Sequence, residues 1–272
     1  KYLSLDNPAK ASYLHGLQMI CEATIGFIQR HAETARELAG TEPDPGRQQE
    51  YQRIARCCEH IAVEPPRTYY EGVQWIHFAV LLDRVVGHGN GYGRLDQYLI
   101  DLYRQDKAAG RLTDEEAREY LAEMFLKLRG HFFSMGGRDA KLNDATNEMS
   151  FIILEAYDLI GDYNNLGVMW HPDIDPEFYA YACDVLARHG ESIPVLVNYD
   201  LMRAAQLRSG IPEDDAWEVA YSGCQWFCIP GKEFCDQDVN SINLLAPMQR
   251  AIYAAIALEV EEFEIGSHGL RK

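Results

Sequence analysis

Cysteine residues near the end of the chain are the first candidates for chemistry. Cys224, Cys228 and Cys235 are separated by three and six intervening residues. This spacing fits neither a zinc knuckle nor a usual iron–sulfur motif, so we predict no metal site. Gly223 permits a tight turn before Cys224. Cys224 is therefore a structural cysteine on a turn or a reactive thiol, and no characteristic protease context favours a Cys–His–Asp nucleophile.

A glycine-rich segment at residues 87–94 is the second candidate. Four glycines occur between positions 87 and 93, interleaved with His88 and Tyr92. This composition predicts a loop shaped by its backbone, which is either a flexible turn or a loop that closely approaches a ligand. It is not a phosphate-binding loop, because no Gly-Lys-Ser/Thr sequence follows.

The elements that must position these residues are mostly helices. Hydrophobic periodicity and end signals predict helices over residues 9–40, 48–62, 69–86, 95–107, 114–129, 147–159, 176–189, 212–219 and 243–264. Short apolar runs at 165–170 and 193–198 predict buried strands. Strands that alternate with helices in this way are typical of an α/β protein with a parallel sheet.

Several polar residues have the positions of helix caps. Thr113 and Glu116 match a capping box. Asp144 and Asn147 are expected to cap the helix that begins near them. Residues 41–46 are predicted to form a loop, because they include two prolines and a glycine.

Composition and charge exclude several classes of function. The chain has 272 residues and a formal net charge of −17, so it lacks the basic surface that nucleic acids or anionic membranes require. No apolar run approaches the ~18 residues of a membrane-spanning helix. Seven cysteines, an odd number, argue against a disulfide framework and favour a reducing, cytoplasmic location.

Six short motifs follow one another between residues 64 and 244. They occupy residues 64–75, 87–98, 136–150, 190–198, 221–224 and 243–244, and they include the sequences EPPRTYYEGVQW, GRLDQY, DATNEMS and SGC. Each motif is weak alone, but their order resembles the glycyl radical enzymes of the pyruvate formate-lyase-like superfamily. The resemblance is nearer to the dehydratase, lyase and decarboxylase branch than to pyruvate formate-lyase itself.

The resemblance implies a fold and a domain organisation. The family's barrel has ten strands in two parallel half-barrels wrapped by helices, with the catalytic cysteine on an internal loop. We expect residues 1–63 to form a flanking helical segment. Residues 64–272 would form part of the barrel, with the cysteine loop near 221–228. The C-terminal motif that carries the radical glycine is absent from the sequence, so the chain resembles an internal fragment that we expect to be inactive alone.

The resemblance also implies a chemistry. Cys224 would carry a thiyl radical that abstracts hydrogen from a small organic substrate, without a dissociable cofactor. The expected partners are a radical S-adenosylmethionine activating enzyme, the remainder of the polypeptide and a second copy in a homodimer, in an anaerobic organism. His88 has the family's substrate-contact position. Arg94 and Asp96 are expected to form a buried structural ion pair or to be separate loop anchors.

Three departures from the family pattern concern the substrate. Trp226 replaces the glutamate of a Gly-Cys-x-Glu motif and cannot accept a proton. Gly89 stands where a serine is frequent, and Trp170-His171 where many members have an arginine. With Tyr92 and Phe227, the two tryptophans would form an aromatic, poorly hydrated pocket.

The departures favour a lyase that cleaves or forms a C–C or C–X bond in an aromatic or bulky substrate. One alternative is a dehydratase or eliminase of a diol or amino alcohol with a relocated base, for which Glu233, Asp236 and Asp238 are candidates. Another alternative is a truncated, non-catalytic relic.

Overall fold

The computed structural model describes residues 8–86, 91–128, 132–161, 165–190, 193–222, 226–233 and 245–255. It contains two compact units, residues 1–235 and 236–272. The described helix of the second unit is α10 (Leu245–Ala255), whose exposed apolar residues include Leu245, Met248 and Ile252. The division expected at residue 63 stays a prediction.

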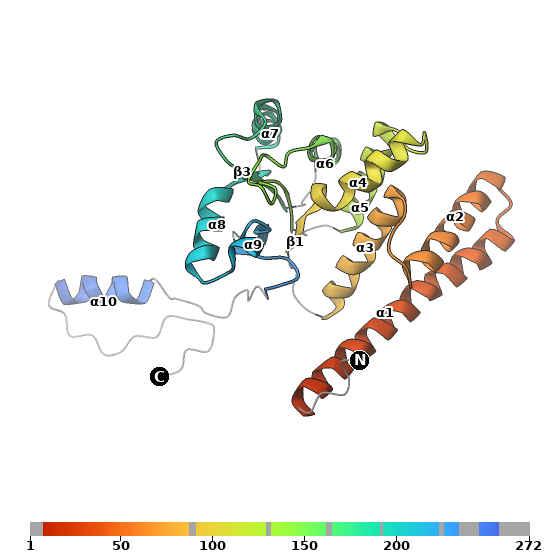
Figure 1. Ribbon diagram of the computed structural model, residues 1–272, viewed down its shortest axis with the longest axis horizontal. Helices are drawn as coiled ribbons and strands as arrows, with labels where there is room; N and C mark the ends of the chain where they lie inside the picture. Colours follow the sequence, from red (N-terminus) through yellow and green to blue (C-terminus); the bar gives the residue numbers. More distant parts are fainter. Residues whose placement is uncertain are drawn as a thin grey trace. The chain divides into compact units, whose positions relative to one another are not determined.

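A parallel sheet of four strands organises the first unit (Figure 1). Its strands follow chain order and are β1 (Gly91–Arg94), β2 (Phe132–Gly136), β3 (Asn165–Trp170) and β4 (Val195–Asn198). Each neighbouring pair is parallel, which confirms the predicted fold class. The last two strands were expected from their apolar runs, although β4 begins two residues later than predicted.

The first two strands differ from the sequence-based expectation. Residues 91–94 pair with β2 in a strand instead of continuing a loop, because the ladder can form despite the low strand propensity of glycine. Gly93, with φ of 77°, gives this short strand an irregular backbone. The run Phe132–Gly136 was missed because a five-residue apolar run has no periodicity that separates a strand from a helix end.

Five helices bury one face of the sheet, which we call the helix face. They are α3 (Tyr69–Val86), α4 (Leu95–Ala108), α5 (Asp114–Lys127), α6 (Glu148–Ile160) and α7 (Pro176–His189). Alternate strand residues, among them Phe133, Met135, Leu166 and Val168, enter one core cluster with these helices. The capping box of Thr113 and Glu116 is confirmed.

The opposite face carries a second, smaller core, and we call it the hairpin face. Met169 of β3 packs there with Tyr199 and Tyr221. Its other elements are α8 (Tyr199–Arg208), α9 (Glu213–Ala216), β5 (Ala220–Ser222) and β6 (Trp226–Cys228). Figure 1 shows α8 and α9 across the sheet from α6. Helix α8 was not predicted, and α9 is shorter than the expected 212–219.

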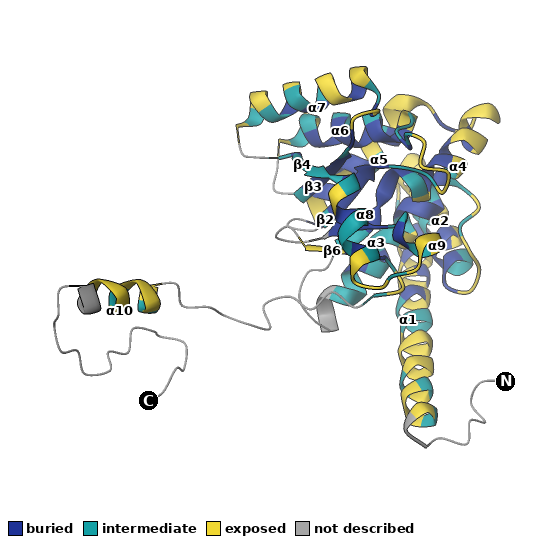
Figure 2. Cartoon of the chain, turned by 60° about the vertical axis from the view of Figure 1, so that its left-hand side comes forward, coloured by how far each residue is buried: buried dark blue, intermediate teal, exposed yellow. Residues whose placement is uncertain are grey.

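The N-terminal helices α1 (Pro8–Thr41) and α2 (Pro45–Ile61) form an antiparallel pair that shares a small core with Phe78 of α3. The predicted loop at 41–46 is too long by three residues, because residues 41, 45 and 46 belong to the two helices. Asp44 caps α2 by accepting from the backbone N–H of Arg47, and Pro45 occupies the first turn, where its missing N–H costs nothing. Much of the first half of α1 is exposed, whereas the strands are largely buried (Figure 2).

No helix among the described residues has both the length and the apolar character needed to cross a bilayer.

Candidate active site

An antiparallel hairpin of β5 and β6 brackets the predicted catalytic cysteine. Ser222 at the end of β5 pairs with Trp226 at the start of β6. The three residues that join them, 223–225, include Cys224 and lie outside the described residues, as do His88 and Gly89 of the glycine-rich segment. The geometry of the site is therefore that of the hairpin and the strands beneath it.

The hairpin packs on three successive strands of the sheet. The Ser134 hydroxyl of β2 donates a 2.8 Å hydrogen bond to the carbonyl oxygen of Tyr221. On β3, the ring of Tyr221 covers Gly167, where an added Cβ would lie 2.5 Å from Cδ1 of the ring. On β1, a Cβ at Gly93 would lie 3.0 Å from Cγ of Pro230. The hairpin is thus fixed against β1, β2 and β3 together.

The chain after the hairpin is held by Glu233. One of its carboxylate oxygens, Oε2, accepts from the backbone N–H of Ile229 at 2.7 Å and from the side-chain amide of Gln206 at 2.6 Å. The bond from Ile229 closes the turn after β6, and the bond from Gln206 connects this turn to α8. Glu233 thus makes structural hydrogen bonds, whereas Asp236 and Asp238 lie outside the described residues.

Two of the predicted substrate contacts lie on the hairpin. Trp226 and Phe227 are neighbours in β6 and remain 39% and 37% exposed. Successive residues of a strand point to opposite sides, so the two rings do not face the same volume. Each offers an apolar surface next to the segment that contains Cys224.

The other two predicted aromatic contacts lie on the helix face. The Tyr92 hydroxyl donates to Asp83 Oδ2 of α3 at 2.8 Å, and its ring lies 5.7 Å from that of Phe133. Trp170 packs against the helix-face core, and its ring centroid lies 6.4 Å from that of Tyr179 in α7. The structure does not bring these residues to the hairpin, because strand alternation turns them to the other side of the sheet.

Buried anchors connect the carboxyl ends of β1 and β2. Arg94 donates through Nη1 to the carbonyl oxygens of Gly136 and Arg138. Asp96 is fully buried and accepts from the Gly136 N–H at 2.7 Å and from the Ser150 hydroxyl at 2.6 Å. Burial raises the pKa of Asp96 above its ordinary value. Both residues therefore have the structural roles that were expected of them.

A second buried group lies at the end of β3. His171 Nε2 is 2.9 Å from the carbonyl oxygen of Gly137 and 3.2 Å from Asp144 Oδ1. Both neighbours are acceptors, so the network assigns the proton to Nε2. Asp144 also accepts from the Asp175 N–H, the residue that caps α7. Asn147 caps α6 as predicted, but Asp144 instead joins β3 to the start of α7.

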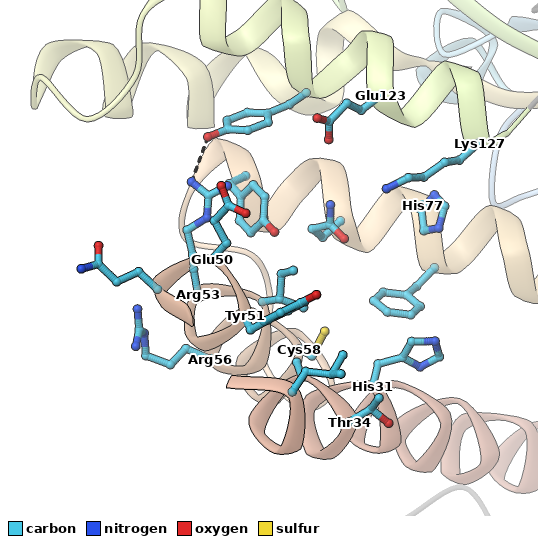
Figure 3. A pocket seen from close by; sticks show the side chains of 18 of the residues that line it. His31, Thr34, Glu50, Tyr51, Arg53, Arg56, Cys58, His77, Glu123 and Lys127 are labelled. Carbon is cyan, nitrogen blue, oxygen red and sulfur yellow. Dashed lines mark hydrogen bonds between the residues drawn. The ribbon is translucent and has the colours of Figure 1, made fainter. Parts of the chain in front are cut away.

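Two cavities in the described part of the chain lie away from the hairpin. One, of about 1110 Å³, lies between the N-terminal helices and α3 and α5, where Arg53 donates to the Tyr120 hydroxyl (Figure 3). Another, of about 820 Å³, is lined by apolar residues of α3 and α4 and includes Tyr92. Within the described parts of the chain, no cluster of three or more His, Cys, Asp or Glu residues could hold a metal ion.

Sequence reasoning missed Ser134 and Gly167, the two residues beneath Tyr221. A signal exists in the strands, because small residues interrupt otherwise bulky runs at positions that face the hairpin: Phe-Phe-Ser-Met in β2 and Asn-Leu-Gly-Val-Met-Trp in β3. These small residues indicate a packing site only once residues 132–136 are recognised as strand β2, next to β3.

The parallel sheet, its covering helices and the hairpin together define the class of protein. The chain belongs to the pyruvate formate lyase-like family, whose model matches residues 2–259. Its relatives are glycyl radical enzymes, which carry a protein-based radical instead of a dissociable cofactor.

Similar proteins catalyse different reactions. The chain is 27% identical to an isethionate sulfite-lyase of Nitratidesulfovibrio vulgaris over 97% of this chain and 34% of that protein. It is 26% identical to a (2S)-3-sulfopropanediol dehydratase of Klebsiella oxytoca, over 89% of this chain and 32% of that protein. A glycerol-bound structure of the B12-independent glycerol dehydratase from Clostridium butyricum matches with a TM-score of 0.77 and 26% identity, over 84% and 32% of the two chains. The chain thus spans about a third of the length of these relatives.

Proposed function

We propose that this chain forms the cysteine-bearing part of a glycyl radical lyase, in which a Cys224 thiyl radical abstracts hydrogen from a small organic substrate. The observation that supports the proposal most is the hairpin. In a chain that belongs to this family, it brackets Cys224 and is fixed on one face of a parallel sheet. A thiol held in this way can be kept at reacting distance from a substrate with little freedom to move.

The proposed step transfers one hydrogen atom. The substrate C–H bond breaks homolytically, its hydrogen and one electron form the S–H bond of Cys224, and a carbon radical remains. After a C–C or C–X bond has been cleaved or formed, the product radical takes a hydrogen atom back and regenerates the thiyl radical. No external oxidant or reductant is consumed in this cycle.

The initial radical must come from elsewhere. We propose that it is stored on a glycine in a segment that this sequence does not contain and is generated by a radical S-adenosylmethionine activating enzyme. The remainder of the barrel, and a second copy of the protein in a homodimer, complete the proposed assembly. On this proposal the chain alone is inactive.

The substrate is proposed to be aromatic or bulky. Trp226, which follows Cys224 by two residues, offers an apolar surface in place of a proton acceptor, and Phe227 offers a second apolar surface on the opposite side of β6. His88 and Gly89 are retained as proposed substrate contacts from the family pattern. Tyr92 and Trp170 are left out of the proposed pocket, because they pack on the helix face.

A dehydratase or eliminase with a relocated base is the second candidate. The similarity to two dehydratases favours it. Glu233 is a poor candidate for the base, because its Oε2 already accepts two structural hydrogen bonds. Asp236 and Asp238 remain as proposed positions for such a base.

The test is anaerobic activation of the gene product that carries this sequence. We expect a glycyl radical doublet by electron paramagnetic resonance, and turnover of aromatic or bulky organic compounds. Turnover confined to small diols or amino alcohols would establish the dehydratase alternative. Both candidates would be contradicted if an activating enzyme generates the glycyl radical in the glycyl radical enzyme that it normally activates but generates none in this protein.

A further inference from the structure

Three small residues lie beneath the hairpin on adjacent strands. They are Gly93 of β1, Ser134 of β2 and Gly167 of β3. Ser134 is in register with Gly167 and with Arg94, the residue that follows Gly93. The side chain of Ser134 is fully buried. Bulky side chains occupy the intervening positions of β2 and β3, but they point to the helix face. On the hairpin face, β5 can therefore pack close to the backbone of β2 and β3, because no large side chain lies between them at Ser134 and Gly167.

Tyr221 contacts both small residues, Ser134 and Gly167. Its carbonyl oxygen accepts from Ser134, which fixes the β5 backbone over β2. Its ring lies directly against Gly167, since an added Cβ would approach the three ring atoms Cδ1, Cγ and Cε1 at 2.5, 3.0 and 3.2 Å. Tyr221 is only 3% exposed, so its ring has little room to move aside.

We infer that Ser134, Gly167 and Tyr221 form a hairpin seat that sets how closely the cysteine loop approaches the sheet. The inference rests on the proposed function of Cys224, and it assigns these three residues as positioning residues that do not themselves contact substrate. Tyr221 precedes Cys224 by three residues and pairs with Phe227 across the hairpin. A displacement of its ring is therefore transmitted to both strands that hold the loop.

The physical consequence is a strict requirement for glycine at position 167. The Cβ of an alanine at position 167 would overlap the Tyr221 ring, so the substitution must lift β5 or rotate Tyr221 out of its buried position. A displacement of about 1 Å at a reacting group can cost about 100-fold in rate. The loss of rate should appear in kcat and not in KM, because the substrate can still bind while the distance for hydrogen transfer is wrong.

The test uses Gly167→Ala in the activated gene product, with the glycyl radical content measured by electron paramagnetic resonance. We expect kcat per radical to fall by about 10- to 100-fold, with KM changed less than about threefold. Val168→Ala is the matched control. It removes buried volume from the same strand but on the helix face, so it should lower thermal stability and leave kcat per radical within about twofold.

A double-mutant cycle separates positioning from general damage. In a Tyr221→Ala background the ring is absent, so adding Gly167→Ala should reduce kcat by less than about twofold. An equal loss in both backgrounds, or unchanged kcat in the single variant, would overturn the inference. If Gly167→Ala does not fold, Ser134→Ala removes only one hydroxyl and should lower kcat about 3- to 10-fold, and an unchanged kcat in that variant is then the overturning result.

The two levels of the proposal fail differently. If the wild-type protein forms no glycyl radical, or turns over substrate without Cys224, the proposed function is wrong. If the wild-type protein behaves as proposed and Gly167→Ala matches it, only the hairpin seat is wrong.

Discussion

Single buried residues hold the strand ends that surround the proposed site. Asp96 lies in the first turn of α4 but accepts hydrogen bonds from the end of β2 and from α6, so one carboxylate joins three elements. Burial disfavours its charge, and the hydrogen bonds from Gly136, Ser150 and Gln97 offset that cost. The residue is structural because each of its oxygens already has a partner.

Replacing Asp96 with asparagine should therefore destabilise the fold. Whichever carboxylate oxygen becomes the amide NH₂ then faces a donor, since Oδ1 accepts from Gln97 and Oδ2 from Gly136 and Ser150. We expect a loss of about 1–3 kcal/mol in the free energy of unfolding, measured with urea. Asp101→Asn, an exposed change in the same helix, should stay within about 0.5 kcal/mol. Equal effects of the two variants would contradict the assigned role.

At the scale of elements, local signals determine where several helices begin. The Thr113 hydroxyl accepts from the Glu116 N–H, and the Glu116 carboxylate accepts from the Thr113 N–H. These two hydrogen bonds satisfy backbone donors that the first turn of α5 leaves unpaired.

Thr113→Ala should remove the side-chain half of this box. The expected loss is about 1 kcal/mol in the free energy of unfolding, observed as a lower urea midpoint. Thr34→Ala is the control, because the Thr34 hydroxyl only donates to the carbonyl of Arg30 within exposed α1. A change below about 0.5 kcal/mol is expected there, and a larger effect at Thr34 than at Thr113 would refute the capping argument.

The contact between α1, α2 and α3 should be sensitive to alkaline pH. Burial, with smaller contributions from Cys58 and Glu71, raises the pKa of Cys57 from 9.0 to about 12. Below pH 9 the thiol is protonated in both the folded and unfolded states. Above pH 9 only the unfolded state releases the proton, so stability declines as the pH rises toward 12.

Urea unfolding at pH 8 and pH 10.5 measures this effect. The wild-type protein should lose more stability over this interval than Cys57→Ala, by at most about 1.4 kcal/mol for each pH unit above 9. Cys21→Ala, which changes an exposed cysteine, should retain the wild-type pH dependence. Identical pH dependence in wild type and Cys57→Ala would rule out the buried thiol as a source.

The sequence predicts elements best where the signal is local. The bounds of α3, β3 and α7 agree with the predicted ranges because periodicity or an apolar run coincides with clear end signals. Strand β1 was not predictable, since its pairing with β2 is a non-local interaction that overrides glycine's poor propensity. The split of the four aromatic residues between two faces likewise depends on strand register, which no local pattern around Tyr92 revealed.

At the scale of the whole molecule, the described sheet agrees with the fold that the family resemblance implied. Four parallel strands, five helices on one face and a hairpin on the other correspond to part of a glycyl radical enzyme barrel. The hairpin residues Trp226 and Phe227 remain partly exposed in this chain, and the relatives are about three times as long. We therefore expect the remainder of the proposed enzyme to cover these two side chains.

The most direct test of the account is turnover by Cys224→Ser in the activated gene product. We expect this variant to acquire the glycyl radical signal, because the radical is stored elsewhere, but its substrate turnover should fall below detection. Cys21→Ser, a change of an exposed cysteine in α1, should retain wild-type turnover. Undiminished turnover by Cys224→Ser, at a radical content equal to wild type, would contradict the account.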